Sequence, residues 1–168
     1  MKVTLCSIET AQQAEPVKVL MEEYAASLHI DLQFQHFQEE LRQLPGHYAA
    51  PGGALFLARA DGEPAGCAAL HRLSSCRGEL KRLFVKPAFR HEGVGDQLIR
   101  AVLKQAVQLS YRYVRLDTLP SMAAAQKLYE KFGFYDIDPY VYNPVKDARY
   151  MEADLQTACG QGRLVSDD

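Results

Sequence analysis

The sequence is poor in the features that mark several classes of protein. It has only four cysteines and no Cys-x-x-Cys pair, so neither a disulfide framework nor a zinc site is indicated. The formal net charge of −2 gives no reason to expect nucleic acid or a membrane as a partner. No apolar run could span a bilayer, and the N-terminal residues lack the length and flanks of a signal peptide. We therefore expect a cytoplasmic protein with reduced thiols.

The composition otherwise fits one globular domain. Hydrophobic residues make up 48% and charged residues 24% of 168 residues, which is enough for a full core. We predict a single domain over residues 1–156 and a mobile tail over residues 157–168. Cys67 lies in an apolar run and is predicted to be a small core residue. The five histidines show no metal-ligand spacing, so no metal site is predicted.

The most informative stretch runs from Glu79 to Ile99. It begins with an apolar, aromatic strand that Pro87 ends, because proline donates no hydrogen bond to a ladder. Gly93 and Gly95 follow, and the apolar residues after them recur at helical spacing. A glycine-rich turn at a helix N-terminus can bind an anion through the first-turn N–H groups and the helix dipole. An ordinary strand-to-helix turn is the alternative interpretation.

The turn reads Arg90-His-Glu-Gly-Val-Gly95. It lacks the Gly-Lys-Ser/Thr ending of a P-loop and the third glycine of a dinucleotide-binding fingerprint, which disfavours an oxidoreductase domain. A second block, Ala125-Gln-Lys-Leu-Tyr-Glu-Lys-Phe-Gly-Phe134, follows after one predicted strand. Over roughly residues 50 to 140, the two blocks in this order resemble the GCN5-related N-acetyltransferase (GNAT) superfamily. The resemblance implies an N-acetyltransferase that uses acetyl-CoA as co-substrate.

The remaining patterns supply a layout of strands and helices. Strands are predicted at 3–8, 54–60, 64–73, 79–85, 112–118, 134–138 and 149–153, and helices at 15–28, 32–44, 94–106 and 121–132. Asp61-Gly62 marks a hairpin turn. The strands that flank the helix 94–106 are predicted to be parallel. The layout and the resemblance together predict an α/β (α+β) single domain, with a mixed, mostly antiparallel sheet, a central parallel strand pair and flanking helices.

The resemblance also implies where acetyl-CoA would bind. In the superfamily the pantetheine arm pairs with the backbone of the central strand, and the amide of Leu83 is the expected donor to the thioester oxygen. The pyrophosphate would meet the amides of the glycine turn. Relatives often place an asparagine where this chain has Met122, and Ser121 is the available replacement. The predicted coenzyme contacts are Leu83, Phe84, Val85, Arg90, His91, Glu92, Gly93, Val94, Gly95, Asp96 and Ser121.

Two residues are candidates for proton transfer, both through the resemblance. Glu79 matches the catalytic glutamate of the histone-acetylating branch and is the candidate general base. The alternatives are a water chain, or a carboxylate that balances the neighbouring Lys81 and Arg82. Tyr129 stands where many superfamily members place a tyrosine beside the coenzyme sulfur, which makes it the candidate general acid. The alternative is a core tyrosine, since Tyr129 shares a helical face with apolar residues.

The acceptor side is assigned to the first two helices and the 135–147 loop. These segments carry Tyr24, His29, Phe34, Phe37, Tyr140, Tyr142 and Asn143. Aromatic residues with a few polar groups suit a small-molecule amine, an amino acid or a peptide terminus. Four carboxylates are interpreted as solvated helix faces: Glu22, Glu23, Glu39 and Glu40. The predicted reaction is direct attack of a primary amine on the thioester in a ternary complex. A non-catalytic acyl-CoA-binding regulatory module is the alternative, and a homodimer stays open.

Overall fold

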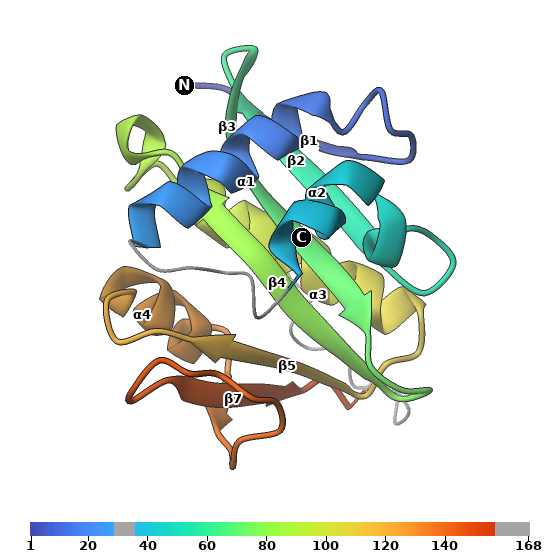
Figure 1. Cartoon of the computed structure of the whole chain (residues 1–168), viewed down its shortest axis with the longest axis vertical. Coiled ribbons are helices and arrows are strands. Elements are labelled where there is room, and N and C mark those ends of the chain that lie inside the picture. Colours follow the sequence, from blue (N-terminus) through green and yellow to red (C-terminus); the bar gives the residue numbers. More distant parts are fainter. Residues whose placement is uncertain (29–35, 157–168) are drawn as a thin grey trace.

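A seven-stranded sheet forms the centre of the molecule in the computed structural model, which describes residues 1–28 and 36–156 (Figure 1). The strands are β1 (Val3–Ser7), β2 (Ala54–Ala60), β3 (Glu63–Arg72), β4 (Arg77–Val85), β5 (Tyr113–Thr118), β6 (Tyr135–Asp136) and β7 (Arg149–Asp154). The helices are α1 (Glu15–Leu28), α2 (Phe37–Gln43), α3 (Val94–Gln108) and α4 (Ala123–Lys131), with the 3-10 turns η2 (Gly46–Tyr48) and η3 (Pro87–Phe89).

The strand order in the sheet is β1-β2-β3-β4-β5-β7-β6. β4 and β5 pair in parallel and are linked through α3, whereas the other neighbours pair antiparallel. The tight Asp61-Gly62 turn joins β2 to β3, because both residues adopt the positive φ that a hairpin turn needs. The predicted mixed, mostly antiparallel sheet with a central parallel pair is therefore confirmed.

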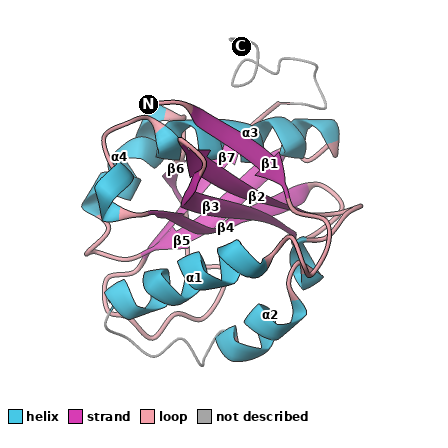
Figure 2. Cartoon of the chain, turned by 90° about the horizontal axis from the view of Figure 1, so that it is seen from above, coloured by secondary structure: helices cyan, strands magenta, loops and turns pink. Residues whose placement is uncertain are grey.

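Helices cover both faces of the sheet (Figure 2). α1 and α2 lie on one face, where Leu55 and Leu57 of β2 pack in one core with Leu20 of α1. α3 and α4 lie on the other face, where Ala58 of β2 joins Leu98 of α3 in a second core. The alternation of side chains along a strand sends neighbouring residues of β2 to opposite cores, as expected for a sheet buried on both faces.

β4 departs from regular geometry in its second half. Its parallel pairing with β5 covers only the residues Arg77 to Glu79, although β4 continues to Val85. On the other side, the register with β3 shifts between Cys67 and Ala69, so that two residues of β4 stand opposite one of β3. This is a β-bulge, which bends a strand and increases its twist. The two strands of the parallel pair consequently separate beyond Glu79.

Several predicted segments differ in extent from the structure, the second helix most of all. The second helix was predicted over 32–44 but is described as Phe37–Gln43, since residues 32–35 lie outside the described ranges. Leu44 ends that helix because it precedes a proline and adopts extended backbone. The strand predicted at 134–138 shortens to Tyr135–Asp136. The predicted tail, 157–168, lies outside the described residues, so the domain boundary stays a prediction.

None of the helices within residues 1–28 and 36–156 is long and apolar enough to cross a membrane. Across the same ranges, no group of three or more His, Cys, Asp or Glu side chains is placed to hold a metal ion.

Candidate active site

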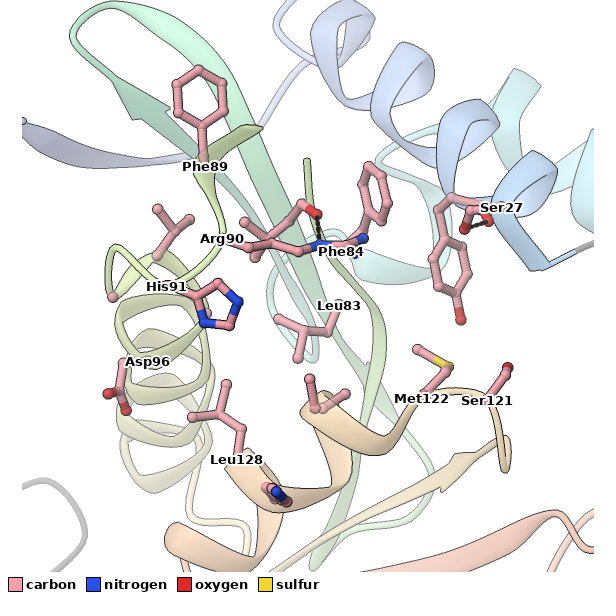
Figure 3. Close-up of a pocket in the computed structure, with 18 of the residues that line it drawn as sticks. Ser27, Leu83, Phe84, Phe89, Arg90, His91, Asp96, Ser121, Met122 and Leu128 are labelled. Atoms are coloured by element: carbon pink, nitrogen blue, oxygen red, sulfur yellow. Dashed lines mark hydrogen bonds between the residues drawn. The ribbon is translucent and has the colours of Figure 1, made fainter. Parts of the chain in front are cut away.

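A cavity of about 740 Å³ opens between the second half of β4, the start of α3 and the helix α4 (Figure 3). It lies where β4 has separated from β5. Its walls come from Leu83, Phe84 and Val85 of β4, from the glycine turn, and from the first turns of α4. Ser121 and Met122 line it just before α4 begins. One cavity therefore joins the edge of β4 that is not paired with β5 to the N-terminus of α3.

The glycine turn has the backbone geometry of an anion site. Gly93 caps the N-terminus of α3 at a φ of 81°, in the left-handed region that glycine tolerates best. His91 also has a positive φ of 67°, so two residues of this turn adopt left-handed backbone before the helix begins. Successive N–H groups in such a turn form a concavity that binds anions, and the helix dipole adds to it.

Gly95 is needed for space. A Cβ at this position would stand 2.9 Å from Cδ2 of Leu128, so α4 packs directly on the first turn of α3. Lys131 of α4 lines the cavity and its Nζ lies 2.6 Å from Oδ2 of Asp96, with Lys127 one turn earlier on the same wall. The end of the cavity at the α3 N-terminus thus combines main-chain donors with two lysine cations, which fits a diphosphate.

Arg90 has a contact that the sequence did not indicate. Its Nε donates a hydrogen bond of 3.0 Å to the carbonyl oxygen of Val85 (Figure 3). This bond ties the glycine turn to the end of β4. Arg90 lines the cavity, so its predicted contact with phosphate stays a prediction that the geometry allows.

The predicted coenzyme contacts come together in this cavity, with one exception. Those that line it are Leu83, Phe84, Val85, Arg90, His91, Gly93, Val94, Gly95, Asp96 and Ser121. Glu92 lies in the same turn but is not among the lining residues, and it is exposed. Its assignment as a contact stays a prediction without support from the cavity.

Tyr129 is buried in the core on the α3 side, with 5% of its surface exposed. Its ring stands 5.7 Å from that of Phe134, and it is not among the residues that line the cavity. Burial raises the pKa of Tyr129 well above its ordinary value, so the phenol stays protonated at neutral pH. The core position that was the alternative is therefore observed, and a role as acid is compatible with its protonation.

A second phenol, Tyr24 of α1, does line the cavity. Its ring packs edge-on against Phe84 with 5.9 Å between centroids. Burial raises the pKa of Tyr24 to about 12, although the charge of Arg82 opposes the shift. The sequence assigned Tyr24 only to the acceptor side, because helical spacing does not tell which residue of α1 faces β4.

Glu79 is buried, with 4% of its surface exposed, and lies outside the cavity lining. Tyr140, from the loop between β6 and β7, donates a hydrogen bond of 2.7 Å to Oε2 of Glu79. His71 of β3 and Arg115 of β5 stand opposite Glu79 in the sheet register. Arg115 packs over the Tyr140 ring and pairs with Glu152 at 2.8 Å. A loop assigned to the acceptor side thus reaches the candidate base.

A further carboxylate is held by the same loop. Asn143 donates a hydrogen bond of 3.0 Å to Oδ2 of Asp117 on β5. Asp117 is two residues from Arg115, so it points to the same face of the sheet as Glu79. Of the predicted acceptor-side residues, Tyr24, Phe37, Tyr140 and Asn143 lie on this side, whereas Tyr142 is 76% exposed. His29 and Phe34 lie outside the described residues.

One interpretation of the sequence is wrong. Glu40 is not part of a solvated face, because its carboxylate pairs with the guanidinium of Arg82 in two contacts, Nε–Oε2 at 2.9 Å and Nη2–Oε1 at 2.8 Å. The Arg82 side chain is only 4% exposed and that of Glu40 10%. Arg82, which the sequence placed beside Glu79 as a balancing charge, therefore forms its buried ion pair with Glu40. The available signal was a charged residue at an interior position of an apolar strand, which demands a buried partner.

Comparisons with known proteins agree with this geometry. The sequence pattern of the Acetyltransferase (GNAT) family matches residues 17–134. An uncharacterised N-acetyltransferase of Schizosaccharomyces pombe is 31% identical over 157 residues, covering 91% of this chain and 95% of the relative. A GNAT-family acetyltransferase of Staphylococcus aureus superposes with a TM-score of 0.76 at 20% identity, covering 92% of this chain and 99% of its own.

A third protein, the PaiA N-acetyltransferase of Thermoplasma acidophilum, was solved in complex with coenzyme A. It superposes with a TM-score of 0.71 at 16% identity, covering 92% of this chain and 99% of its own.

Proposed function

The chain belongs to the acetyltransferase (GNAT) family and is an acetyl-CoA-dependent N-acyltransferase, and from that premise we propose that it acetylates a primary amine by direct attack in a ternary complex. The acceptor would be a small molecule, an amino acid or a peptide terminus. The cytoplasmic location stays a prediction.

The observation that carries the proposal is the single cavity at the separation of β4 from β5. Beyond Glu79, β4 has no pairing with β5, and this edge of the strand lines the cavity together with the glycine turn of α3. Main-chain groups along the edge can pair with the amides of a pantetheine arm as an added strand would. The α3 N-terminus and the two lysines of α4 can hold the diphosphate at the other end.

The chain's own residues can supply the remaining chemistry. Acetyl-CoA brings the acetyl group as an activated thioester. The Leu83 amide would donate a hydrogen bond to the thioester oxygen, where negative charge develops. As the amine nitrogen bonds to the acetyl carbon and the carbon–sulfur bond breaks, Glu79, directly or through water, would accept the proton of the amine. Tyr129 would return a proton to the sulfur.

The carboxylates of Glu79 and Asp117 support a cationic acceptor. They stand on neighbouring strands and on the same face of the sheet, and the loop that carries Tyr140 and Asn143 reaches both. An ammonium group would be held there by charge until it loses its proton. An acceptor that is neutral at assay pH has no comparable partner in this arrangement.

A thiol-release screen tests the proposal. The purified chain is incubated with acetyl-CoA and a panel of amino acids, polyamines, aminoglycosides and peptide N-termini, and acetylated products are identified by mass spectrometry. Calorimetry with coenzyme A measures binding independently of the acceptor. We expect binding together with amine-dependent thiol release. Absence of coenzyme binding would overturn the proposal, and tight binding without release across the panel would favour the non-catalytic module.

A further inference from the structure

The bulge in β4 is centred on Arg82, whose backbone is unusual. Arg82 has a φ of 59°, in the left-handed region that residues with a side chain rarely occupy. Arg82 and Leu83 together stand opposite Ala68 of β3, because Cys67 pairs with Phe84 and Ala69 with Lys81. The bulge thus follows Glu79, the last residue of β4 that pairs with β5, and includes Leu83, the first residue of β4 that lines the cavity.

The bulge also resets which way the strand faces. In a regular strand, Leu80 and Phe84 would point to the same face, because they are four residues apart. Here Leu80 packs in the core of the α3 side and Phe84 in the core of the α1 side. Leu83 takes the α3 side in its place. The directions of the main-chain groups at Leu83 and beyond are therefore set by the conformation of Arg82.

A buried pair fixes that conformation from outside the strand. Both Nε and Nη2 of Arg82 contact the Glu40 carboxylate of α2, at 2.9 and 2.8 Å. Tyr48 donates a further hydrogen bond of 2.7 Å to Glu40, and the Phe37 ring lies 5.1 Å from the guanidinium. Burial opposes the charge of Glu40, but the hydrogen bonds and charge of Arg82 hold the pKa of this carboxyl below its ordinary value. The pair is consequently ionised at neutral pH.

We propose that Glu40 and Arg82 are positioning residues for acetyl transfer, which hold the bulge of β4 so that the main-chain donors after it face the thioester. The inference rests on the proposed function, because it concerns how the same cavity presents its donors. Glu40 lines no part of the cavity and would act only through Arg82 and the strand. A pair that only stabilised the fold would not need to involve Arg82, the one residue of β4 with left-handed backbone.

The ion pair between Arg112 and Asp154 supplies a control of the same chemical type at a more exposed place, where the two side chains are 40% and 27% exposed. It also uses two contacts, Nε–Oδ1 at 3.2 Å and Nη2–Oδ2 at 3.3 Å, but it joins the residue just before β5 to the last residue of β7, and the register of these two strands is regular. Neither residue lines the cavity. Removing this pair costs an ion pair of similar chemistry without changing the bulge.

The test variant is Glu40→Gln combined with Arg82→Met. It removes both charges of this pair together, so neither Glu40 nor Arg82 is left as the lone charge of the pair, and the glutamine oxygen can still accept the Tyr48 hydrogen bond. Arg112→Met with Asp154→Asn is the control. Each protein is measured for coenzyme A affinity, for kcat with the best acceptor of the screen, and for the infrared carbonyl stretch of bound carbon-13-labelled acetyl-CoA.

We expect the test variant to bind coenzyme A within about threefold of the wild type, because the glycine turn and the lysines proposed to hold the diphosphate are unchanged, but to lose at least about tenfold in kcat. The carbonyl band should move back toward its frequency in water, because the donors no longer face the thioester. The control should keep the wild-type kcat and band. A folded test variant with wild-type kcat and band would overturn the inference, as would a loss of kcat matched by an equal loss of affinity.

Glu40→Asp keeps the inference testable if the double variant does not fold. The shorter carboxylate remains charged but cannot keep both contacts with an unmoved Arg82. A lower kcat with unchanged affinity supports positioning, whereas a wild-type kcat with an unchanged band contradicts it. A wild-type chain that binds no acetyl-CoA would instead overturn the proposed function, and the inference with it.

Discussion

Replacing Tyr129 by phenylalanine should separate catalysis from stability. The substitution removes one oxygen from a side chain that is 5% exposed and leaves its packing on Phe134 in place. Among residues 1–28 and 36–156, no hydrogen bond of the Tyr129 hydroxyl is found. No buried partner is therefore left unsatisfied, and we expect the free energy of unfolding to change by less than about 0.5 kcal/mol.

The effect on turnover should be large. A positioned general acid contributes about 10²- to 10⁴-fold, which corresponds to roughly 3 to 5 kcal/mol of the barrier. Coenzyme affinity should stay within about twofold, because the sulfur takes up a proton only as the carbon–sulfur bond breaks and not in the bound ground state. Burial raises the pKa of Tyr129, so the phenol keeps its proton as pH rises, and the wild-type kcat should show no alkaline loss from this group below about pH 10.

Tyr111→Phe is the matched control, with the opposite expectation. The Tyr111 hydroxyl donates to the carbonyl oxygen of Gly52, and the residue lies outside the cavity lining. Its loss should lower stability by about 1 kcal/mol, or about 2 to 4 °C in Tm for a chain of this size, without changing kcat. Stopped-flow thiol release and thermal unfolding measure both variants. A Tyr129→Phe variant within threefold of the wild-type kcat would remove Tyr129 from the mechanism.

Three further outcomes follow from the site. Glu79→Gln should slow acetyl transfer most at low pH, where the amine is protonated. If kcat/KM of the variant depends on pH in the same way as that of the wild type, Glu79 is not the base. Gly93→Ala should cost roughly 1–2 kcal/mol of stability, because its φ is 81°, and should weaken coenzyme binding in calorimetry; an unchanged Kd would exclude this turn as the diphosphate site. Cys67 should resist iodoacetamide at about pH 8 while Cys6 reacts, since burial raises the pKa of the Cys67 thiol to about 12; peptide mapping that finds Cys67 alkylated in the folded chain would contradict its burial.

Much of the order of helices and strands could be predicted, because residues with local backbone preferences mark where many of these elements begin and end. Pro16 lies in the first turn of α1, Asp61-Gly62 forms the hairpin turn, and Gly133 follows α4 with a φ of 90°. Each of these residues restricts or frees its own backbone, so the sequence alone indicates where elements begin and end. Cys67 was also predicted correctly, since it is fully buried.

The site was harder to predict where it depends on contacts between distant residues. The bulge at Arg82 follows from a partner on α2 that is 42 residues away in the chain, and a side-chain period of two cannot reveal a local shift of register. Tyr140 meets Glu79 across 61 residues. Glu40 looked like a solvated residue because its neighbour Glu39 is one, and only the packing of α2 against β4 distinguishes them.

The parallel pairing of β4 with β5 is confined to three residue pairs at one end, from Arg77 to Glu79. Beyond that end each strand keeps its other neighbour, since β4 pairs with β3 as far as Val85 and β5 pairs with β7 as far as Thr118. A change of angle between β4 and β5 would therefore move β4 together with β3, and β5 together with β7. A ligand in the opening beyond Glu79 thus lies between two halves of one sheet whose direct ladder is only three residue pairs long.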